Sequence, residues 1–142
     1  METKAVYEID IEDIRQVLQR KVKMVIPHLS VISEANVMQH WTKRRKRRIV
    51  QDSIIRTFWR MEKYHNTVEC NKPYVIILTR MSPRRLDGDN LQVAFKSIRD
   101  TIADILIPGK KRGVSDSAPG LTWIYDQEKG SKGIKIEIYA KD

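Results

Sequence analysis

Two aspartates separated by one glycine form the strongest chemical signal in this sequence. Asp87 and Asp89 lie where the continuous apolar run YVIILTRM (74–81) gives way to an expected helix, and Gly88 between them lets the backbone bend. Two carboxylates this close repel each other, and a divalent cation relieves that repulsion. Magnesium prefers hard oxygen ligands and shares phosphate oxygens with its substrates. The pattern therefore predicts a magnesium site suited to phosphodiester hydrolysis.

The same segment also has a purely structural interpretation. Asp89 or Asn90 could accept hydrogen bonds from the free N–H groups of the helix, and Asp87-Gly88 could form a turn. The four letters DGDN alone do not separate the two interpretations.

The charge balance points to a polyanionic partner. The 27 Lys and Arg residues outnumber the 18 acids, which gives a net charge of +9 on 142 residues. Such an excess on a small domain favours nucleic acid as the partner. The alternative for each cluster is a solvated surface, or a balance of local charge. The residues predicted to contact DNA phosphates are Lys43, Arg44, Arg45, Lys46, Arg47, Arg48, Arg84, Arg85, Lys110, Lys111 and Arg112.

Periodicity predicts the elements that must position these residues. A long helix is expected over 35–63 with Ser33 as its N-cap, and a second over 90–107, ended by Pro108 and Gly109. Residues 1–20 are an uncertain N-terminal extension, with AVYEIDI typical of a strand and IEDIRQVLQR of a short helix. Strands are expected over 21–27, 74–81, 121–127 and 133–140, the last two as a hairpin. We therefore expect a single domain of mixed α/β class: a small mixed β-sheet with two main helices and crossover connections.

Composition excludes several classes of protein. Cys70 is the single cysteine, so an internal disulfide and a cysteine-rich zinc site are excluded. No run of 18 apolar residues and no signal-peptide pattern is present, so we expect a cytoplasmic protein without a membrane partner. Among the tryptophans, Trp59 and Trp123 are expected in the core, whereas Trp41 beside the basic run could stack on DNA bases.

A resemblance to a known family appears once these segments are read together. RRLDGDNL, followed by Lys96 and Asp100, then GVSD and LTWIYDQEKG, resembles the RusA family of Holliday-junction resolvases, in particular its phage-type members. The segment SEANVMQHWTKRRKRRIVQ is similar to the early basic helix of that family. The likeness runs from about residue 22 to 140, and its most specific part is Asp-x-Asp-Asn-Leu.

The resemblance implies roles for particular residues. Asp87 and Asp89 match the metal-binding acids of the family, and the third acid maps best onto Asp116, with Asp100 and Asp104 as alternatives. Family members often have two adjacent acids where this chain has Ser115-Asp116. Lys96 stands closest to the position of the catalytic lysine, although in some members that lysine falls where this chain has Val93. Alternatively, Lys96 and Asp100 form an ordinary i,i+4 pair.

The resemblance also implies an activity. It predicts a Mg²⁺-dependent endodeoxyribonuclease, with Mn²⁺ as a possible substitute, that resolves four-way junctions in branched DNA as a homodimer. The source would be a bacterium, or a phage within its bacterial host. Two alternatives remain open at this point: a DNA-binding protein without catalysis, and a nuclease that acts on flaps, forks or RNA.

Overall fold

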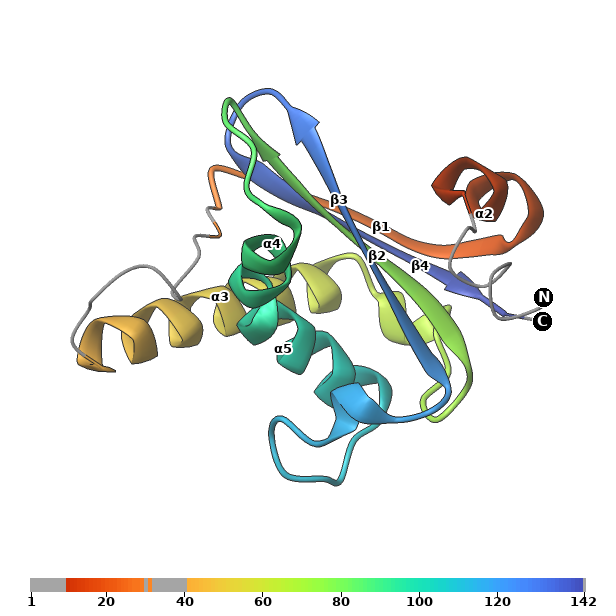
Figure 1. The fold of residues 1–142 in the computed structure, drawn as a ribbon. Coiled ribbons are helices and arrows are strands. Elements are labelled where there is room, and N and C mark those ends of the chain that lie inside the picture. Colours follow the sequence, from red (N-terminus) through yellow and green to blue (C-terminus); the bar gives the residue numbers. More distant parts are fainter. Residues whose placement is uncertain (1–9, 30, 32–40, 142) are drawn as a thin grey trace.

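A four-stranded mixed sheet organises the chain (Figure 1). The computed structural model describes residues 10–29, 31 and 41–141, with the side chain of Trp41 left outside that description. The elements, in chain order, are α2 (Ile11–Val17), β1 (Gln19–Pro27), α3 (Trp41–Met61), β2 (Tyr74–Ser82), α4 (Gly88–Ala94), α5 (Lys96–Leu106), β3 (Leu121–Lys129) and β4 (Gly133–Ala140), with short 3₁₀ turns η1 (Tyr64–Asn66) and η2 (Ser115–Ser117).

The strand order is β1-β4-β2-β3. Strand β3 pairs in parallel with β2, whereas β4 runs antiparallel to both of its neighbours, β1 and β2. A parallel pair needs a crossover connection, and α4 with α5 supplies it between β2 and β3. The mixed α/β class and the crossover connections are therefore confirmed.

The predicted hairpin of the last two strands is wrong. β3 and β4 follow each other in the chain, but β2 lies between them in the sheet. The central place of β2 suits its sequence, because Tyr74–Thr79 are all buried and a strand covered on both faces reads as a continuous apolar run. This correction matters for the site, because it places β3 directly beside the strand that leads to Asp87.

Alternate residues of the strands face two different layers. Ile76, Leu78, Ile136 and Ile138 pack with α3, α4 and α5 in the main core. Val75, Ile77 and Tyr139 point to the opposite face and pack with Ile14 of α2 in a smaller cluster. Figure 1 shows the same arrangement, with α2 on one side of the sheet and the other helices on the other side.

The helices differ from the sequence expectation in one place. The predicted second helix is two helices, α4 and α5, that meet at Phe95. Phe95 has ψ near 0°, away from the helical value, and its N–H is shared between the carbonyls of Leu91 and Gln92 at 3.2 Å each. Its fully buried ring explains the break, because the ring packs against Tyr125 of β3 with centroids 6.1 Å apart.

The two other predicted helices are found in part. Helix α3 agrees with the expected helix over 41–61, while Ser33 and residues 35–40 lie outside the described residues. In the N-terminal extension, the helix alternative is confirmed over Ile11–Val17, and residues 1–9 lie outside the description. None of the helices in the described ranges has both the length and the apolar character that crossing a bilayer requires.

Candidate active site

The two aspartates of the DGDN segment lie at the beginning of α4. Asp87 is the residue before the helix, and its carbonyl accepts the hydrogen bond from Leu91 N–H at 2.8 Å. Its side chain makes no capping hydrogen bond, although the position is one where aspartate commonly caps. Asp89 is exposed and lies inside the first turn, one residue past the helix start, so it does not hold the N-cap position. The capping interpretation therefore does not account for either carboxylate.

Gly88 is not required by the fold. A Cβ built on this residue would meet no atom within 4 Å, and its φ is not in the left-handed region. Gly88 was expected to let the backbone bend, and neither its φ nor its surroundings makes glycine necessary for that. The space beside Gly88, the residue between Asp87 and Asp89, is therefore open.

The loop that precedes Asp87 is held by a side chain from β3. The Gln127 amide accepts from Leu86 N–H at 2.8 Å and donates to Leu86 C=O at 2.8 Å. This pairing satisfies both backbone groups of one residue with one planar side chain. It fixes the position of the backbone immediately before Asp87, so Gln127 is a positioning residue for the acidic segment.

A second cluster of charged side chains lies between α5 and η2. The Lys96 ammonium donates to Asp100 Oδ1 at 3.0 Å and to Asp116 Oδ2 at 3.1 Å. The i,i+4 pair of Lys96 and Asp100 is thus present, but it is joined by a third partner 20 residues away. Asp116 is almost fully buried, with 6% of its side chain exposed, whereas Lys96 is 53% exposed. The lysine reaches from solvent onto a buried carboxylate.

Asp116 is held from several directions. Arg99 Nε lies 3.0 Å from Asp116 Oδ2, and Arg99 Nη2 donates to the Asp116 carbonyl at 3.2 Å. The indole N–H of Trp123 donates to the same carbonyl at 2.9 Å. Tyr125 in turn accepts from Arg99 Nη1 at 2.7 Å, and the Arg99 guanidinium lies 4.9 Å from the centre of the Trp123 ring. The backbone and one oxygen of Asp116 are therefore fixed by side chains of α5 and β3.

Three alternate residues of β3 make these contacts, and we call them the β3 row: Trp123, Tyr125 and Gln127. Residues two apart on a strand share a face. Trp123 contacts the Asp116 segment, Tyr125 contacts Arg99, and Gln127 contacts the Asp87 loop. One face of one strand thus holds both acidic segments. Sequence reasoning missed the roles of Arg99, Tyr125 and Gln127, and the Trp-x-Tyr-x-Gln spacing was the signal that could have found two of them.

The charge state of Lys96 follows from its partners. Partial burial lowers the pKa of the ammonium, but the hydrogen bonds to Asp100 and Asp116 outweigh that effect and the pKa is raised. Lys96 therefore stays protonated at neutral pH. It can stabilise negative charge on a phosphate, and it cannot act as a general base there.

Asp116 Oδ1 is a buried carboxylate oxygen with no hydrogen-bond partner among the described residues. Leaving such an oxygen unpaired costs free energy, on the order of 1–3 kcal/mol, unless a cation or another group satisfies it. The oxygen therefore fits a hard divalent cation. Within the described ranges, however, no three Asp, Glu, His or Cys side chains already form a metal-binding group. The site formed by Asp87, Asp89 and Asp116 stays a prediction.

The two alternative third ligands separate clearly. Asp100 shares Lys96 with Asp116 and belongs to the same cluster. Asp104 lies one turn further along α5 and makes an ion pair of 3.5 Å with Arg112. Arg112 also pairs with Asp52 of α3. Desolvation raises the pKa of Asp104, although Arg112 acts in the opposite sense. Asp104 Oδ1 is also buried without a hydrogen-bond partner among the described residues, so it is the ion pair with Arg112 that assigns Asp104 to a different group of charges.

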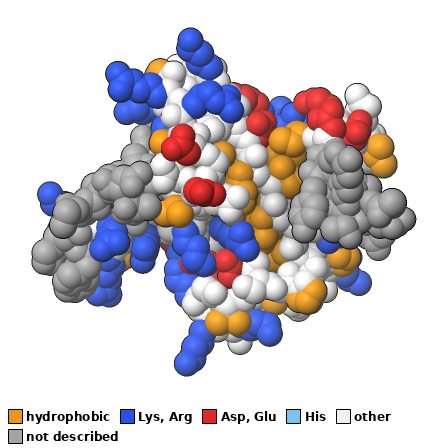
Figure 2. All heavy atoms as spheres, in the orientation of Figure 1, with side chains coloured by type: hydrophobic (Ala, Val, Ile, Leu, Met, Phe, Trp, Pro, Cys, Tyr) orange, Lys and Arg blue, Asp and Glu red, His pale blue; other side chains and the backbone are white. Residues whose placement is uncertain are grey.

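The residues predicted to contact DNA lie in three segments at the surface. Arg44 and Arg47 are half-buried on α3. The exposed ones are Lys43, Arg45, Lys46, Arg48, Arg84, Arg85, Lys110, Lys111 and Arg112. Figure 2 shows basic side chains bordering acidic ones in the middle of one face of the molecule. Because the basic run of α3 exposes residues all round the helix, it offers charge in several directions.

The aromatic predictions are met where they can be examined. Trp59 is buried in the main core, and Trp123 is half-buried against it as part of the β3 row. The side chain of Trp41, the proposed base-stacking residue, lies outside the described residues.

No family model, no curated protein and no solved structure matches this chain. The likeness to the RusA family therefore depends on the motif residues of the chain itself.

Proposed function

We propose that the chain is a divalent-metal-dependent endodeoxyribonuclease that hydrolyses phosphodiester bonds in branched DNA, four-way junctions in particular. The observation that carries the proposal is the unpaired, buried Asp116 Oδ1 beside a lysine held between two aspartates. The net charge of +9 supports a polyanionic substrate. The motif residues support the choice of branched DNA.

In this account Lys96 stabilises the transition state. Its ammonium is protonated, half-exposed and oriented by Asp100 and Asp116. A fixed positive charge near the phosphate opposes the negative charge that grows on the phosphate oxygens during displacement. The orientation is set before substrate binds, so little free energy is lost in ordering the lysine.

Asp87, Asp89 and Asp116 would hold the metal, with Asp100 as the alternative third ligand. When bound, Mg²⁺ or Mn²⁺ supplies Lewis-acid polarisation of the phosphodiester. The chain itself must bring the Asp87 loop and the Asp116 segment together, and the β3 row contacts both. Arg99 holds Asp116 by its carbonyl and by Oδ2, which leaves Oδ1 for the cation.

Four-way junctions have two strands to cut, and a symmetric homodimer would present two such sites. The dimer is part of this proposal and is tested with it. Paired nicks at symmetric positions require two sites acting on one junction, whereas a monomer would give single nicks.

The test is cleavage of a labelled synthetic four-way junction with Mg²⁺ or with EDTA, by the wild type and by Asp89→Asn. Matching linear duplex and flap substrates are run alongside. Asp13→Asn is the matched control, because Asp13 is exposed on α2 and removes the same charge elsewhere. We expect paired nicks across the junction that require Mg²⁺ and Asp89 but not Asp13.

Other results would correct or overturn the proposal. Equal cleavage of flaps and junctions would keep the nuclease and change its target. DNA binding without cleavage in Mg²⁺ and Mn²⁺, unaffected by Asp87→Asn and Asp89→Asn, would overturn it. The chain would then be a DNA-binding protein without catalysis.

A further inference from the structure

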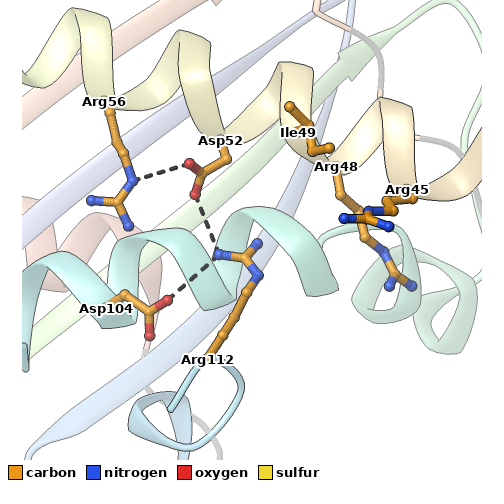
Figure 3. A pocket seen from close by; sticks show the side chains of 7 residues that line it. All are labelled: Arg45, Arg48, Ile49, Asp52, Arg56, Asp104 and Arg112. Atoms are coloured by element: carbon orange, nitrogen blue, oxygen red, sulfur yellow. Dashed lines mark hydrogen bonds and ion pairs between the residues drawn. The ribbon is translucent and has the colours of Figure 1, made fainter. Parts of the chain in front are cut away.

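A second charged hollow lies beside the face of α5 next to the one that carries Lys96 and Asp100. It is a cleft of about 510 Å³ between α3, α5 and the loop that follows α5 (Figure 3). Its lining consists of four arginines, two aspartates and one apolar side chain: Arg45, Arg48, Ile49, Asp52, Arg56, Asp104 and Arg112. Four positive and two negative side chains leave an excess of two positive charges, so the cleft favours an anion.

The lining residues of α3 form one stripe. Residues 45, 48, 52 and 56 are three or four apart, which places them on one face of a helix. Figure 3 shows their side chains on the side of α3 that faces α5. Gln51 and Ile55, on the neighbouring face of α3, are 3% and 0% exposed and fix the helix against the core. The cleft-facing stripe is therefore held in a fixed orientation.

Ion pairs fix the inner end of the cleft. Arg112 Nη1 lies 3.3 Å from Asp52 Oδ1 and 3.5 Å from Asp104 Oδ2, and Arg56 Nε lies 3.1 Å from Asp52 Oδ2. Arg112 also donates to the Ser97 carbonyl at 3.2 Å. The two carboxylates therefore orient Arg56 and Arg112, while Arg45 and Arg48 stand further along the stripe toward the beginning of α3.

The cleft and the acidic cluster share one helix. Ser97, Thr101 and Asp104 face the cleft, whereas Lys96 and Asp100 face Asp116. Successive residues of a helix turn by about 100°, so Ser97 lies on the face of α5 next to that of Lys96. On a helix about 10–12 Å wide, two such faces are roughly 8–9 Å apart. A nucleic-acid strand rises about 3.4 Å per nucleotide, so this separation corresponds to roughly two to three nucleotides of one strand.

We propose that this cleft is a phosphodiester-binding subsite that holds the DNA backbone a few nucleotides from the bond to be cut. Arginine guanidinium groups bind phosphate oxygens through two parallel N–H donors. Arg45 and Arg48 are exposed and line the end of the cleft nearer the beginning of α3, so we assign the phosphate contact to them. Asp52 and Asp104 keep Arg56 and Arg112 in place behind them. The inference rests on the proposed function for its ligand, DNA, but it concerns binding and needs no catalysis.

The experiment measures DNA binding in EDTA, where no cleavage occurs. The cleft variant is Arg45→Gln with Arg48→Gln. The control is Arg60→Gln with Lys63→Gln, which removes the same charge from two exposed residues at the other end of α3 and beyond it. Affinity for a four-way junction is measured over a range of salt concentrations. Thermal unfolding of both variants verifies that each is folded.

The cleft variant should lose about two phosphate contacts. We expect the slope of log K against log salt to become shallower by about two, and affinity near 0.1 M salt to fall roughly tenfold to a hundredfold. The control should show a clearly smaller change in both quantities. Equal changes in the two variants would mean that only net charge matters, and that result would overturn the subsite.

Replacing one charged phosphate of the DNA by a neutral linkage locates the phosphate that Arg45 and Arg48 contact. Single methylphosphonate linkages are placed in turn around the branch point of the junction. At one or two positions they should weaken binding by the wild type and leave binding by the cleft variant unchanged. If every methylphosphonate linkage weakened binding by the cleft variant as much as binding by the wild type, that result would overturn the subsite. Because binding is measured in EDTA, a wild type that binds in this way but never cleaves would refute the nuclease and leave the subsite standing.

Discussion

Two buried carboxylates on opposite faces of the sheet have opposite surroundings. Glu137 on the α2 face is 2% exposed, and both of its oxygens are paired: Arg15 donates to them at 2.8 and 3.1 Å, and the Tyr139 hydroxyl donates at 2.7 Å. Asp116 on the other face keeps one buried oxygen without a partner in the described part of the chain. A buried acid with both oxygens paired belongs to the fold, whereas a buried oxygen without a partner, as at Asp116 and also at Asp104 Oδ1, calls for a further group such as a cation.

The contrast extends to the neighbouring side chains. Around Glu137 the arginine packs between α2 and the sheet, and the tyrosine lies two residues along the same strand. Around Asp116 the lysine is half-exposed and open to a ligand. The α2 cluster is therefore expected to govern stability and the Asp116 cluster to govern activity. The predictions below test that division, beginning with the largest effect.

Asp116→Asn should remove cleavage and keep the fold. The amide retains an oxygen for Lys96 and Arg99 but loses the negative charge that a cation needs, so we expect the cleavage rate to fall about 10³-fold. The free energy of unfolding should fall by less than for Glu137→Gln, by about 1–2 kcal/mol, because Lys96 keeps Asp100 and Arg99 keeps the carbonyl of residue 116. Single-turnover cleavage and urea unfolding measure the two effects. A loss of stability of several kcal/mol with residual activity would place Asp116 in the same class as Glu137.

Lys96→Met should lower the cleavage rate about 10²-fold, because a charge that stabilises the transition state is lost. DNA affinity in EDTA should change less than about threefold, since one partly screened charge contributes little to overall binding. Lys132→Met, which removes an exposed lysine from the turn before β4, is the control. If both variants cleave equally well, the Lys96–Asp100 pair is an ordinary surface ion pair.

Glu137→Gln should destabilise the fold and spare the chemistry. The substitution leaves the Arg15 guanidinium, which is 22% exposed, without its buried partner. We expect the free energy of unfolding to fall by about 2–3 kcal/mol. The cleavage rate per folded molecule should stay within about twofold of the wild type. A large loss of activity at unchanged stability would break the division between the two faces.

The same cluster predicts a pH dependence of stability. Burial raises the pKa of Glu137, but the hydrogen bonds from Arg15 and Tyr139 outweigh it and the pKa lies below its ordinary value of 4.5. Stability from this group is therefore present above pH 4.5 and is lost as pH falls through the lower, folded-state pKa. Burial also raises the pKa of Tyr139 to about 12, so its contribution is lost between pH 10 and 12. Glu137→Gln should flatten the acid limb of the stability curve.

Gln127→Met should weaken the acidic site through the loop it holds. The variant keeps the volume of the side chain and removes both hydrogen bonds to Leu86. We expect the Mg²⁺ concentration for half-maximal cleavage to rise about tenfold, as for loss of an outer partner of a metal ligand. DNA affinity in EDTA should stay the same. Asp126→Asn, on the other face of β3, is the control, and an equal Mg²⁺ requirement in the two variants would refute the positioning role.

Gly88→Ala should have the smallest effect on the fold. A Cβ there meets open space, so stability should be unchanged or rise by up to about 1 kcal/mol. Gly109→Ala is the comparison, because Gly109 has φ +93° and an alanine there is strained by about 1 kcal/mol or more. Urea unfolding of both variants gives the two values. A marked loss for Gly88→Ala would show that the backbone at the acidic turn is constrained after all.

Local patterns in the sequence predicted one half of the candidate site. Asp87 and Asp89 share a short segment between a strand and a helix, so their types and spacing were enough to single them out. The sequence also predicted the mixed sheet, because apolar periodicity marks strands and helices reliably when they are long.

The rest depends on contacts between distant segments. Glu137 is buried because Arg15, 122 residues away, pairs with it, and a single acid in a strand carries no such information. The Trp-x-Tyr-x-Gln spacing puts the β3 row on one face of a strand, but the expected hairpin with β4 gave no indication of what that face of β3 contacts. Its functional face is defined only by the parallel pairing with β2, which brings Trp123 to Asp116 and Gln127 to Leu86.

The central claim is that the Asp87 loop and the Asp116 segment form one cation site, joined by the β3 row. Titration with paramagnetic Mn²⁺, followed by amide NMR signals, tests it most directly. The account predicts that the first equivalent of Mn²⁺ broadens the signals of Asp87, Asp89 and Asp116 together, and that Asp116→Asn abolishes the broadening at the Asp87 loop. Broadening of one segment alone, or of neither, would contradict a shared site.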